Sequence, residues 1–569
     1  MTFNATSFQL PIRNSVIIII FLLLTTSIKS QVPAVDSMGA SMWKKDWKAA
    51  LHWALKAGQD FPPDKNWRYM NAAIFASLDH DADLAFKYLN YVSDSEIAIK
   101  VSYTDKDFDW LHEDSRWKAL MGKVNKLYDR EKQKRIAESK PFRVVQQNLL
   151  DANTKELAAL QKTPSATAIY NYLKATKHKG TSMSEGSYRY HWLKFNDSLE
   201  VTYTIQLPPG FDYHKRYPVI VILHGAVLMN PIFPDILDST KIDFFGRKFI
   251  KTASDFGMIA IFPTSTRKYN WMVPDSGFTI VTDIIREVKR MYNIDDSRVY
   301  VSGHSNGATG AFSYLIKAPS IFAGFSGLNN NPKVRTGGTF LKNAINRSFY
   351  NVATENDYYF PFEAHRTLQG LSKKLSIDWK NMEVNGNREH SYLIVADDSI
   401  TNRVYKDLFA FVLAKKRNPF RSNLYWECDD IKYGRCDWLE TTILDTNAVT
   451  APWHTQINFK VSGWRDSYDP SIVKDSTTQA FQFPRRSGAI KASYKNNTFS
   501  LQTSRVKKAK IFISPEMVDM SKPIKIIANG KVLHNKKVYF NKNFTLEDFG
   551  KHQDHQAIWV NYILLNIPK

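Results

Sequence analysis

One serine in this chain has neighbours that suit a nucleophile. Ser305 lies in the segment Gly303-His304-Ser305-Asn306-Gly307, which has the Gly-x-Ser-x-Gly pattern. In that pattern the serine occupies a sharp turn from a strand to a helix, and the glycines let the backbones pass closely while the hydroxyl stays exposed. The apolar run at 298–301 and the small residues at 308–318 suit that strand and that helix. A plain serine-glycine turn has the same pattern, so the partners of Ser305 decide between the two interpretations.

A carboxylate and a histidine follow Ser305 in an order that nucleophilic catalysis can use. Residues 348–353 have the pattern of a strand, and Asp357 comes just after it, with Glu355 as a nearby rival. Another strand-like segment at 379–384 leads into a polar loop that carries His390. We therefore expect His390 to take a proton from Ser305 and Asp357 to orient the imidazole.

Two other histidines are alternatives to His390. His365 lies on an expected helix after the acidic loop, and His454 lies in what the sequence indicates is a different domain. A lone histidine on a helix is more often a surface or core residue than a base. The spacing from Asp357 favours His390.

Backbone amides near the serine could bind the negative charge that develops on an acyl oxygen. The apolar run at 217–223 has the composition of a strand buried on both faces, and it ends in His224-Gly225-Ala226. A small-residue turn after a central strand can aim an N–H group at this oxygen. The expected donors are the amides of Ala226 and Asn306. His224 is expected to shape the loop without titrating.

Together these segments resemble the α/β-hydrolase superfamily. The likeness is greatest to its secreted esterase and predicted-peptidase branch, which includes feruloyl-esterase-like and polyhydroxybutyrate-depolymerase-like enzymes. It covers roughly residues 188–415 and rests on the segments 207–211, 217–225, 261–263 and 294–303. The chain departs from the usual pattern at Ala308, where similar enzymes often have a second glycine, and in having no glycine immediately before His390.

The resemblance implies an α/β fold with a doubly wound, mostly parallel sheet, and a serine hydrolase that works through an acyl-enzyme without a cofactor or a metal. Carboxylic esters are the expected substrates, either small esters or polysaccharides that carry acyl or feruloyl groups. A serine peptidase of the same superfamily and a non-catalytic binding protein are the alternatives. The loops at 226–245 and 266–277 are expected to supply the apolar and aromatic pocket residues Met229, Phe233, Tyr269 and Trp271.

The first 30 residues have the pattern of a secretory signal peptide. Arg13 precedes a nine-residue apolar core at 16–24, and a short polar tail follows at 25–30. This core is too short to cross a membrane, so we expect an exported protein, periplasmic or secreted, with no stable membrane span. Cys428 and Cys436 are the only cysteines, and in an oxidising compartment we expect them to form a disulfide. Two reduced structural thiols are the alternative.

The chain is basic, with 77 lysines and arginines against 55 acidic residues and a formal net charge of +22. The lysines are scattered, and the densest cluster, at 130–140, also contains glutamates, as a solvated helix would. We therefore expect no nucleic-acid partner. An acidic envelope, an anionic polysaccharide or simple solubility explains the charge as well.

Changes in sequence pattern divide the chain into five regions. After the signal peptide at 1–30, residues 31–140 have helical, alanine-rich and aromatic-rich patterns that resemble tetratricopeptide units, a region that could bind a protein partner. A helix and a polar linker are expected at 141–186, and the catalytic domain at 187–417. Short alternating runs with turn signals at 418–569 predict a β-sandwich-like domain.

Overall fold

A computed structural model of the chain describes residues 33–60, 65–95, 106–176, 189–196, 199–227, 246–265, 269–272, 275–466 and 472–568. The signal-peptide prediction for residues 1–30 and the pocket candidates Met229 and Phe233 lie outside these ranges. The chain forms two compact units. The first contains Met1–Arg135, Met229–Ile232 and Asp466–Asp469, and the second contains Ile136–Leu228, Phe233–Arg465 and Pro470–Lys569.

The first unit is helical in its described part. Its elements are α2 (Pro33–Trp43), α3 (Trp47–Asp60), α4 (Lys65–Leu78), α5 (Ala82–Val92), η2 (Lys106–Glu113) and the start of α7 (Ser115–Leu160). Helix α4 carries the unbroken buried run from Met70 to Ser77 and packs against both α3 and α5. Asp81 caps α5, because its side chain accepts a hydrogen bond from the amide of Leu84 at 2.9 Å.

Helix α7 passes from the first unit into the second, since the boundary between Arg135 and Ile136 falls inside it. Pro141 lies within this helix. A proline removes one backbone donor from a helix, and α7 nevertheless continues for five turns beyond it. In the second unit, the Gln146 side chain of α7 donates to the carbonyl of Trp192 at 2.9 Å and to Glu287 at 2.8 Å.

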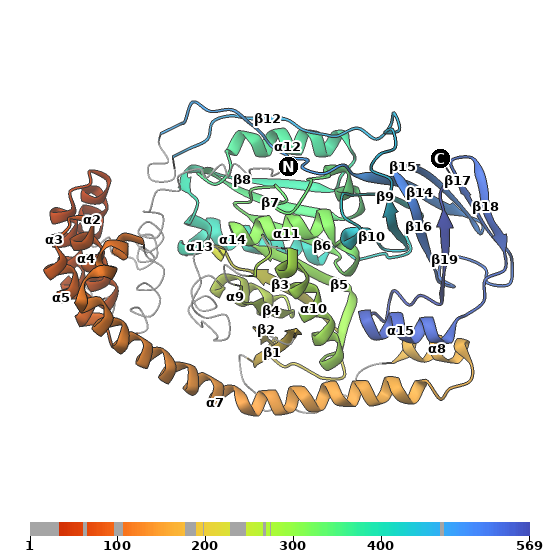
Figure 1. The fold of residues 1–569 in the computed structure, drawn as a ribbon, viewed down its shortest axis with the longest axis horizontal. Coiled ribbons are helices and arrows are strands. Elements are labelled where there is room, and N and C mark those ends of the chain that lie inside the picture. The colour runs from red at the N-terminus through yellow and green to blue at the C-terminus, as the bar shows by residue number, and fades with distance from the viewer. Residues whose placement is uncertain are drawn as a thin grey trace, which may run out of the picture. The chain divides into compact units, whose positions relative to one another are not determined.

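An eight-stranded sheet forms the centre of the second unit (Figure 1). Its strands are β1 (Arg189–Asn196), β2 (Leu199–Gln206), β3 (Tyr217–Leu223), β4 (Ile259–Pro263), β5 (Ile294–Gly303), β6 (Gly324–Leu328), β7 (Ser348–Asn356) and β8 (Trp379–Glu389). The order is β1-β2-β4-β3-β5-β6-β7-β8. All neighbours from β4 to β8 pair in parallel, whereas β2 is antiparallel to both β1 and β4. The expected mostly parallel sheet is therefore confirmed.

Both faces of this sheet are buried, which explains why its central strands are continuous apolar runs. On β3, Val219, Val221 and Leu223 belong to one core cluster, and Ile220 and Ile222 belong to another. The first cluster includes side chains of α10 (Asp275–Met291), α11 (Asn306–Lys317) and α12 (Phe362–Lys374). The second includes side chains of α9 (Arg247–Asp255), α13 (Tyr392–Val395) and α14 (Ser399–Leu413).

The rest of the second unit is rich in short strands that form two larger sheets and one small one. A five-stranded sheet has the order β18-β17-β15-β14-β9, a four-stranded sheet has the order β10-β11-β16-β19, and β12 pairs with β13. The elements are β9 (Asn423–Cys428), β10 (Arg435–Cys436), β11 (Leu439–Leu444), β12 (Lys460–Val461), β13 (Thr478–Gln479), β14 (Gly488–Lys495), β15 (Thr498–Ser504), β16 (Val506–Ile513), β17 (Ile524–Ala528), β18 (Lys531–Lys536) and β19 (Asn561–Asn566), with α8 (Ala166–Ala175), α15 (Lys542–His552), η5 (Pro319–Ile321), η6 (Leu341–Asn346) and η7 (Ile431–Tyr433). Side chains of both larger sheets, among them Trp426 and Leu439, share one core.

Buried ion pairs join the parallel sheet region to these strands. Arg347 precedes β7 and binds Asp437 through two nitrogens, at 2.6 and 3.1 Å. Arg417 binds Asp554 in the same forked way, at 2.6 and 2.7 Å. All four side chains are almost fully buried, so removing one member would leave the other as an uncompensated charge.

The predicted disulfide is wrong, because Cys428 and Cys436 are both free buried thiols. Cys428 ends β9 in the five-stranded sheet, and Cys436 lies on β10 in the four-stranded sheet. The backbone pairing of two different sheets therefore fixes the positions of the two cysteines. Burial raises the pKa of Cys428 to about 12.

Among the residues described, none of the helices combines the length and the apolar character that a membrane crossing requires.

Candidate active site

Ser305 occupies a strained turn between β5 and α11. Its backbone has φ 57° and ψ −121°, a region that non-glycine residues rarely adopt. A Cβ atom on Gly303 would lie 2.6 Å from the carbonyl oxygen of Leu223, and one on Gly307 would lie 1.9 Å from the same oxygen. The two glycines of the motif therefore allow β5 and α11 to pass against the end of β3. The Ser305 side chain stays partly exposed.

The turn after β3 lies against Ser305. A Cβ atom on Gly225 would come within 3.2 Å of the Ser305 Cβ. Ala226 follows with φ 54°, and the amide of Val227 donates to the side-chain oxygen of Asn306 at 3.2 Å. Asn306 is the first residue of α11, where a backbone N–H has no partner within the helix. Both expected amide donors thus belong to turns that border Ser305.

His390 and Asp357 form a direct hydrogen bond, with 2.6 Å between Nδ1 and Oδ1. Asp357 is 1% exposed, and the same oxygen also accepts the backbone N–H of Tyr359 at 2.8 Å. The rival acid Glu355 points elsewhere, since it accepts the amides of Gly386 and Asn387 at 2.8 and 3.0 Å. These backbone hydrogen bonds lower the pKa of the Glu355 carboxyl.

The expected loop before His390 is part of a strand, because β8 continues to Glu389. The pairing with β7 shifts near its end, between Thr354 and Asn356. Gly386 and Asn387 have positive φ values of 94° and 58° there. Glu355 accepts hydrogen bonds from the backbone N–H groups of these two residues. Beyond this irregularity Asn356 pairs with Glu389, so the pairing of the two strands resumes just before His390.

His304 was not anticipated as a site residue, although it lies inside the serine motif. Its Nε2 donates to the carbonyl oxygen of His390 at 2.8 Å, and the two rings lie 4.7 Å apart. Burial, and then the nearby His390 ring, lower the pKa of His304 to about 3. The Asn329 side chain donates to the same carbonyl at 2.6 Å. The backbone of His390 is therefore fixed from two sides, one of them the residue next to Ser305.

The structure brings Ser305 and His390 into the same neighbourhood without a direct bond. In the described part of the chain, the His390 ring has its hydrogen bond to Asp357, and Ser305 Oγ is not a partner. The amide of Ser305 donates to the carbonyl of Leu328 at 3.0 Å. Contacts between a nucleophile and its base are commonly long without substrate and shorten when it binds.

A side-chain hydrogen bond links the serine turn to the loop that carries Asp357. The Asn306 amide nitrogen donates to the Tyr359 hydroxyl at 2.8 Å, and Thr309 Oγ1 lies 3.3 Å from the same hydroxyl. The rings of Tyr358 and Tyr359 lie 4.8 and 5.5 Å from the His390 ring. The position of these tyrosines right after Asp357 was the available sequence signal for this contact.

The two described pocket candidates lie in the core. Tyr269 and Trp271 are 3% and 2% exposed. A Cβ atom on Gly310 would lie 2.4 Å from the Trp271 ring, and that ring meets the His224 ring edge-on at 4.8 Å. His224 also lies 3.1 Å from the Ser265 hydroxyl. Trp271 therefore packs between α11 and the turn after β3.

The two alternative histidines have partners of their own. His365 on α12 is buried beside the Asn351 amide at 3.0 Å, and burial lowers its pKa to about 4. His454 lies in the strand-rich region, where Ser504 and Glu427 bind its two ring nitrogens at 2.9 and 2.8 Å. Within the described ranges, no group of three or more His, Cys, Asp or Glu side chains is arranged to hold a metal ion.

A large mostly parallel sheet with a serine on a strained turn between a strand and a helix fits the α/β-hydrolase fold. No family model and no curated protein matches the sequence.

Several solved esterase structures are similar to part of this chain. A thermostable esterase is 17% identical over 41% of this chain, with a TM-score of 0.33. The chain spans only 64% of that esterase's length. A ferulic acid esterase is 14% identical over 40% of this chain and 97% of its own, with a TM-score of 0.31. Esterase 2 of Thermogutta terrifontis is 14% identical over 40% and 93%, with a TM-score of 0.32.

Proposed function

We propose that this chain is a serine hydrolase that cleaves carboxylic esters, with Ser305 as the nucleophile. The observation that carries the proposal is the 2.6 Å hydrogen bond between His390 and buried Asp357, beside a serine on a strained turn. In this role Asp357 holds the proton on His390 Nδ1 and leaves Nε2 free to act as the base.

The proposed reaction has two halves. Ser305 Oγ attacks the acyl carbon while its proton passes to His390 Nε2, and the amides of Ala226 and Asn306 bind the resulting oxyanion. The tetrahedral intermediate then collapses, the bond to the alcohol oxygen breaks, and that oxygen takes the proton from His390. In the second half, water attacks the acyl carbon while giving a proton to His390 Nε2. The bond from the acyl carbon to Ser305 Oγ then breaks, Oγ takes that proton back, and the carboxylic acid leaves.

We assign aromatic or apolar acyl groups to the acid side of the ester, including feruloyl groups on polysaccharides. The support is the pair of rings, Tyr358 and Tyr359, beside His390. Both are partly exposed, so an acyl group near the histidine would have aromatic faces to stack on.

The experiment is a panel of p-nitrophenyl esters of increasing chain length, a feruloylated sugar and a peptide anilide. The wild type is compared with Ser305→Ala, Asp357→Asn and, as a matched control acid, Glu355→Gln. We expect ester turnover to fall at least about 10³-fold in Ser305→Ala and about 10³–10⁴-fold in Asp357→Asn, while Glu355→Gln stays close to wild type.

Three results would contradict the proposal. Turnover of the anilide alone would identify a peptidase. Full ester turnover in Ser305→Ala would exclude Ser305 as the nucleophile. No turnover of any substrate by the wild type would leave a binding protein.

We also propose that the first 30 residues direct export and that the helical first unit binds a protein partner. The support for export is the short apolar core behind Arg13. Expression of the full chain followed by N-terminal sequencing tests export, since an intact N-terminus in the cytoplasmic fraction would contradict it. Affinity capture with residues 31–163, a fragment that keeps all of α7, compared with the full chain, tests the partner.

A further inference from the structure

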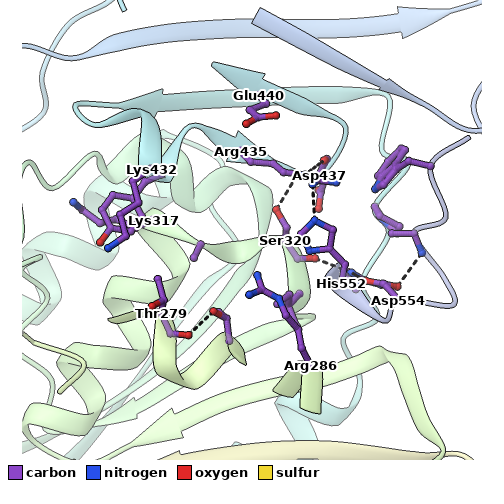
Figure 2. Close-up of a pocket in the computed structure, with 18 of the residues that line it drawn as sticks. Thr279, Arg286, Lys317, Ser320, Lys432, Arg435, Asp437, Glu440, His552 and Asp554 are labelled. Atoms are coloured by element: carbon purple, nitrogen blue, oxygen red, sulfur yellow. Dashed lines mark hydrogen bonds and ion pairs between the residues drawn. The ribbon is translucent and has the colours of Figure 1, made fainter. Parts of the chain in front are cut away.

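A cavity of about 380 Å³ lies in the second unit, away from Ser305 (Figure 2). Its wall is built from α10, the end of α11 with η5, the chain after α14, the segment from η7 to β11, and the end of α15 with the chain after it. Figure 2 shows the labelled polar side chains from these segments gathered around one space. Lys317 closes α11 at this cavity, whereas Asn306 opens the same helix beside Ser305. Twelve helical residues separate the two sites by about 17 Å.

The cavity is lined by more positive than negative side chains. The positive ones are Arg286, Lys317, Arg417, Lys432 and Arg435, and the negative ones are Asp437, Glu440 and Asp554. This excess would attract an anion into a partly enclosed space, where charges are screened less than in bulk water.

The three acids are already bound by cations. Asp554 is held by Arg417, which lines the cavity. Asp437 and Glu440 are held from outside it, by Arg347 at 2.6 Å and by Lys510 at 3.2 Å. Three cations of the wall pair in turn with acids that do not line the cavity, Arg286 with Asp283, Lys317 with Asp429 and Arg435 with Asp548. The charged groups that line the space itself are therefore mainly positive.

Two arginines of the wall are placed to bind a ligand. Arg286 uses one terminal nitrogen for Asp283 at 2.5 Å, and its other terminal nitrogen has no hydrogen-bond partner in the described chain. Arg435 donates to His552 Nε2 at 2.9 Å and reaches Asp548 only at 3.4 Å. Burial, and then the charges of Arg435 and Arg286, lower the pKa of His552 to about 2, as expected in a positive environment.

One side of the cavity is apolar and aromatic. Phe278 and Tyr433 meet edge-to-face with ring centres 5.6 Å apart, and Ile321 and Trp559 also line the space. The volume lies within the range of sites that bind small organic molecules. A ligand that combines one anionic group with an apolar or ring-shaped body would match both parts of the wall.

We propose that this cavity binds a small organic anion whose carboxylate or phosphate group is held by Arg286, Arg435 and Lys432, with its apolar part against Phe278 and Tyr433. Arginine forks suit both kinds of anion, because each offers paired oxygens at the right spacing. The site is separate from Ser305 and does not depend on the proposed hydrolysis.

The test is isothermal titration of the full chain with benzoate, galacturonate and inorganic phosphate at low salt. We expect saturable binding of one ligand per chain for at least one of these probes, weakened by added sodium chloride. The order of affinities distinguishes a carboxylate from a phosphate ligand. Ser305→Ala should bind as the wild type does, because the serine lies at the other end of α11.

Matched pairs of variants locate the binding. Arg286→Gln should weaken it at least about tenfold, whereas Arg298→Gln should not. Both arginines contact an aspartate three residues earlier at 2.5 Å and are about equally exposed, but Arg298 is not part of the wall. Lys432→Gln should also weaken binding, and Lys531→Gln, on the exposed strand β18, should not.

Three results would overturn the proposal. They are the absence of saturable binding for all three probes at millimolar concentration, unchanged affinity in both Arg286→Gln and Lys432→Gln, and loss of binding in Ser305→Ala.

Discussion

The hydroxyl of Tyr359 accepts a hydrogen bond from the side-chain amide of Asn306, 2.8 Å away. Tyr359 also donates its backbone N–H to Asp357, and Asn306 accepts the backbone N–H of Val227. Three separate pieces of the proposed machinery, the acid, the serine turn and the turn after β3, are therefore connected through two side chains.

Tyr359→Phe should lower turnover by about five- to tenfold with little change in KM. The substitution keeps the ring beside His390 and removes the hydroxyl with its two contacts to α11, from Asn306 at 2.8 Å and to Thr309 at 3.3 Å. It therefore loosens the turn that carries the expected oxyanion donor. Steady-state kinetics on the best ester of the panel measures the effect. Tyr350→Phe, a substitution on β7 that loses a 3.2 Å contact to the Met382 sulfur of β8, is the control. An equal loss of turnover in both variants would contradict a specific role for Tyr359.

Gly307→Ala should abolish ester turnover and lower the free energy of unfolding by about 3 kcal/mol. Its Cβ would lie 1.9 Å from the carbonyl oxygen of Leu223, a backbone atom that cannot move without displacing β3. Gly370→Ala is the matched control, because Gly370 lies on α12 with nothing within 4 Å of an added Cβ. That control should gain about 0.5–1 kcal/mol. Urea unfolding compares the two, and a stable, active Gly307→Ala would disprove the close approach.

Glu287 is a buried acid that should make stability depend on pH. Its side chain on α10 accepts the hydroxyl of Tyr203 at 2.7 Å and the amide of Gln146 at 2.8 Å. Burial raises its pKa to about 7. The folded state therefore favours the protonated acid, and stability should be greatest below about pH 4.5, fall between pH 4.5 and 7 by about 3 kcal/mol, and then level off.

Glu287→Gln should flatten this part of the stability profile, because glutamine can accept the same two hydrogen bonds and does not titrate. Urea midpoints at pH 5 and pH 8 measure the slope for the wild type and the variant. Glu138→Gln, at an exposed position of α7, is the control and should keep the wild-type slope. A slope that survives in Glu287→Gln would assign the pH dependence to other groups.

Both cysteines should react as free thiols once the chain is unfolded. Burial raises the pKa of Cys428 to about 12 and also raises the pKa of Cys436, so neither should form a reactive thiolate in the folded protein. Titration with a thiol reagent should count two thiols per chain in denaturant and close to none without it. A count of zero in denaturant, without a reductant, would show a bond between them.

The strands that position the candidate site could be predicted from the sequence. Buried parallel strands are continuous apolar runs, so the segment Tyr217–Leu223 was visible as a strand with its actual bounds. The Ser-Asp-His order likewise pointed to residues that the structure holds near one another, because each follows the end of a parallel strand at the same edge of the sheet.

Contacts between distant segments could not be predicted in the same way. The hydrogen bond from Asn306 to Tyr359 joins residues 53 positions apart, and no local pattern specifies it. The disulfide prediction failed because spacing along the chain carries no information on which sheet each cysteine joins. The cavity at the end of α11 could not be predicted for the same reason, because its charged residues come from five separate segments.

The course of α7 has a practical consequence for dividing this protein into fragments. A catalytic fragment that starts at residue 141 would begin at a proline in mid-helix, with the preceding turns removed. Gln146, which supports both Trp192 and Glu287, would then lie in a newly frayed end. Fragments meant to fold alone should keep all of Ser115–Leu160, so that the cut falls in a loop and not within a helix.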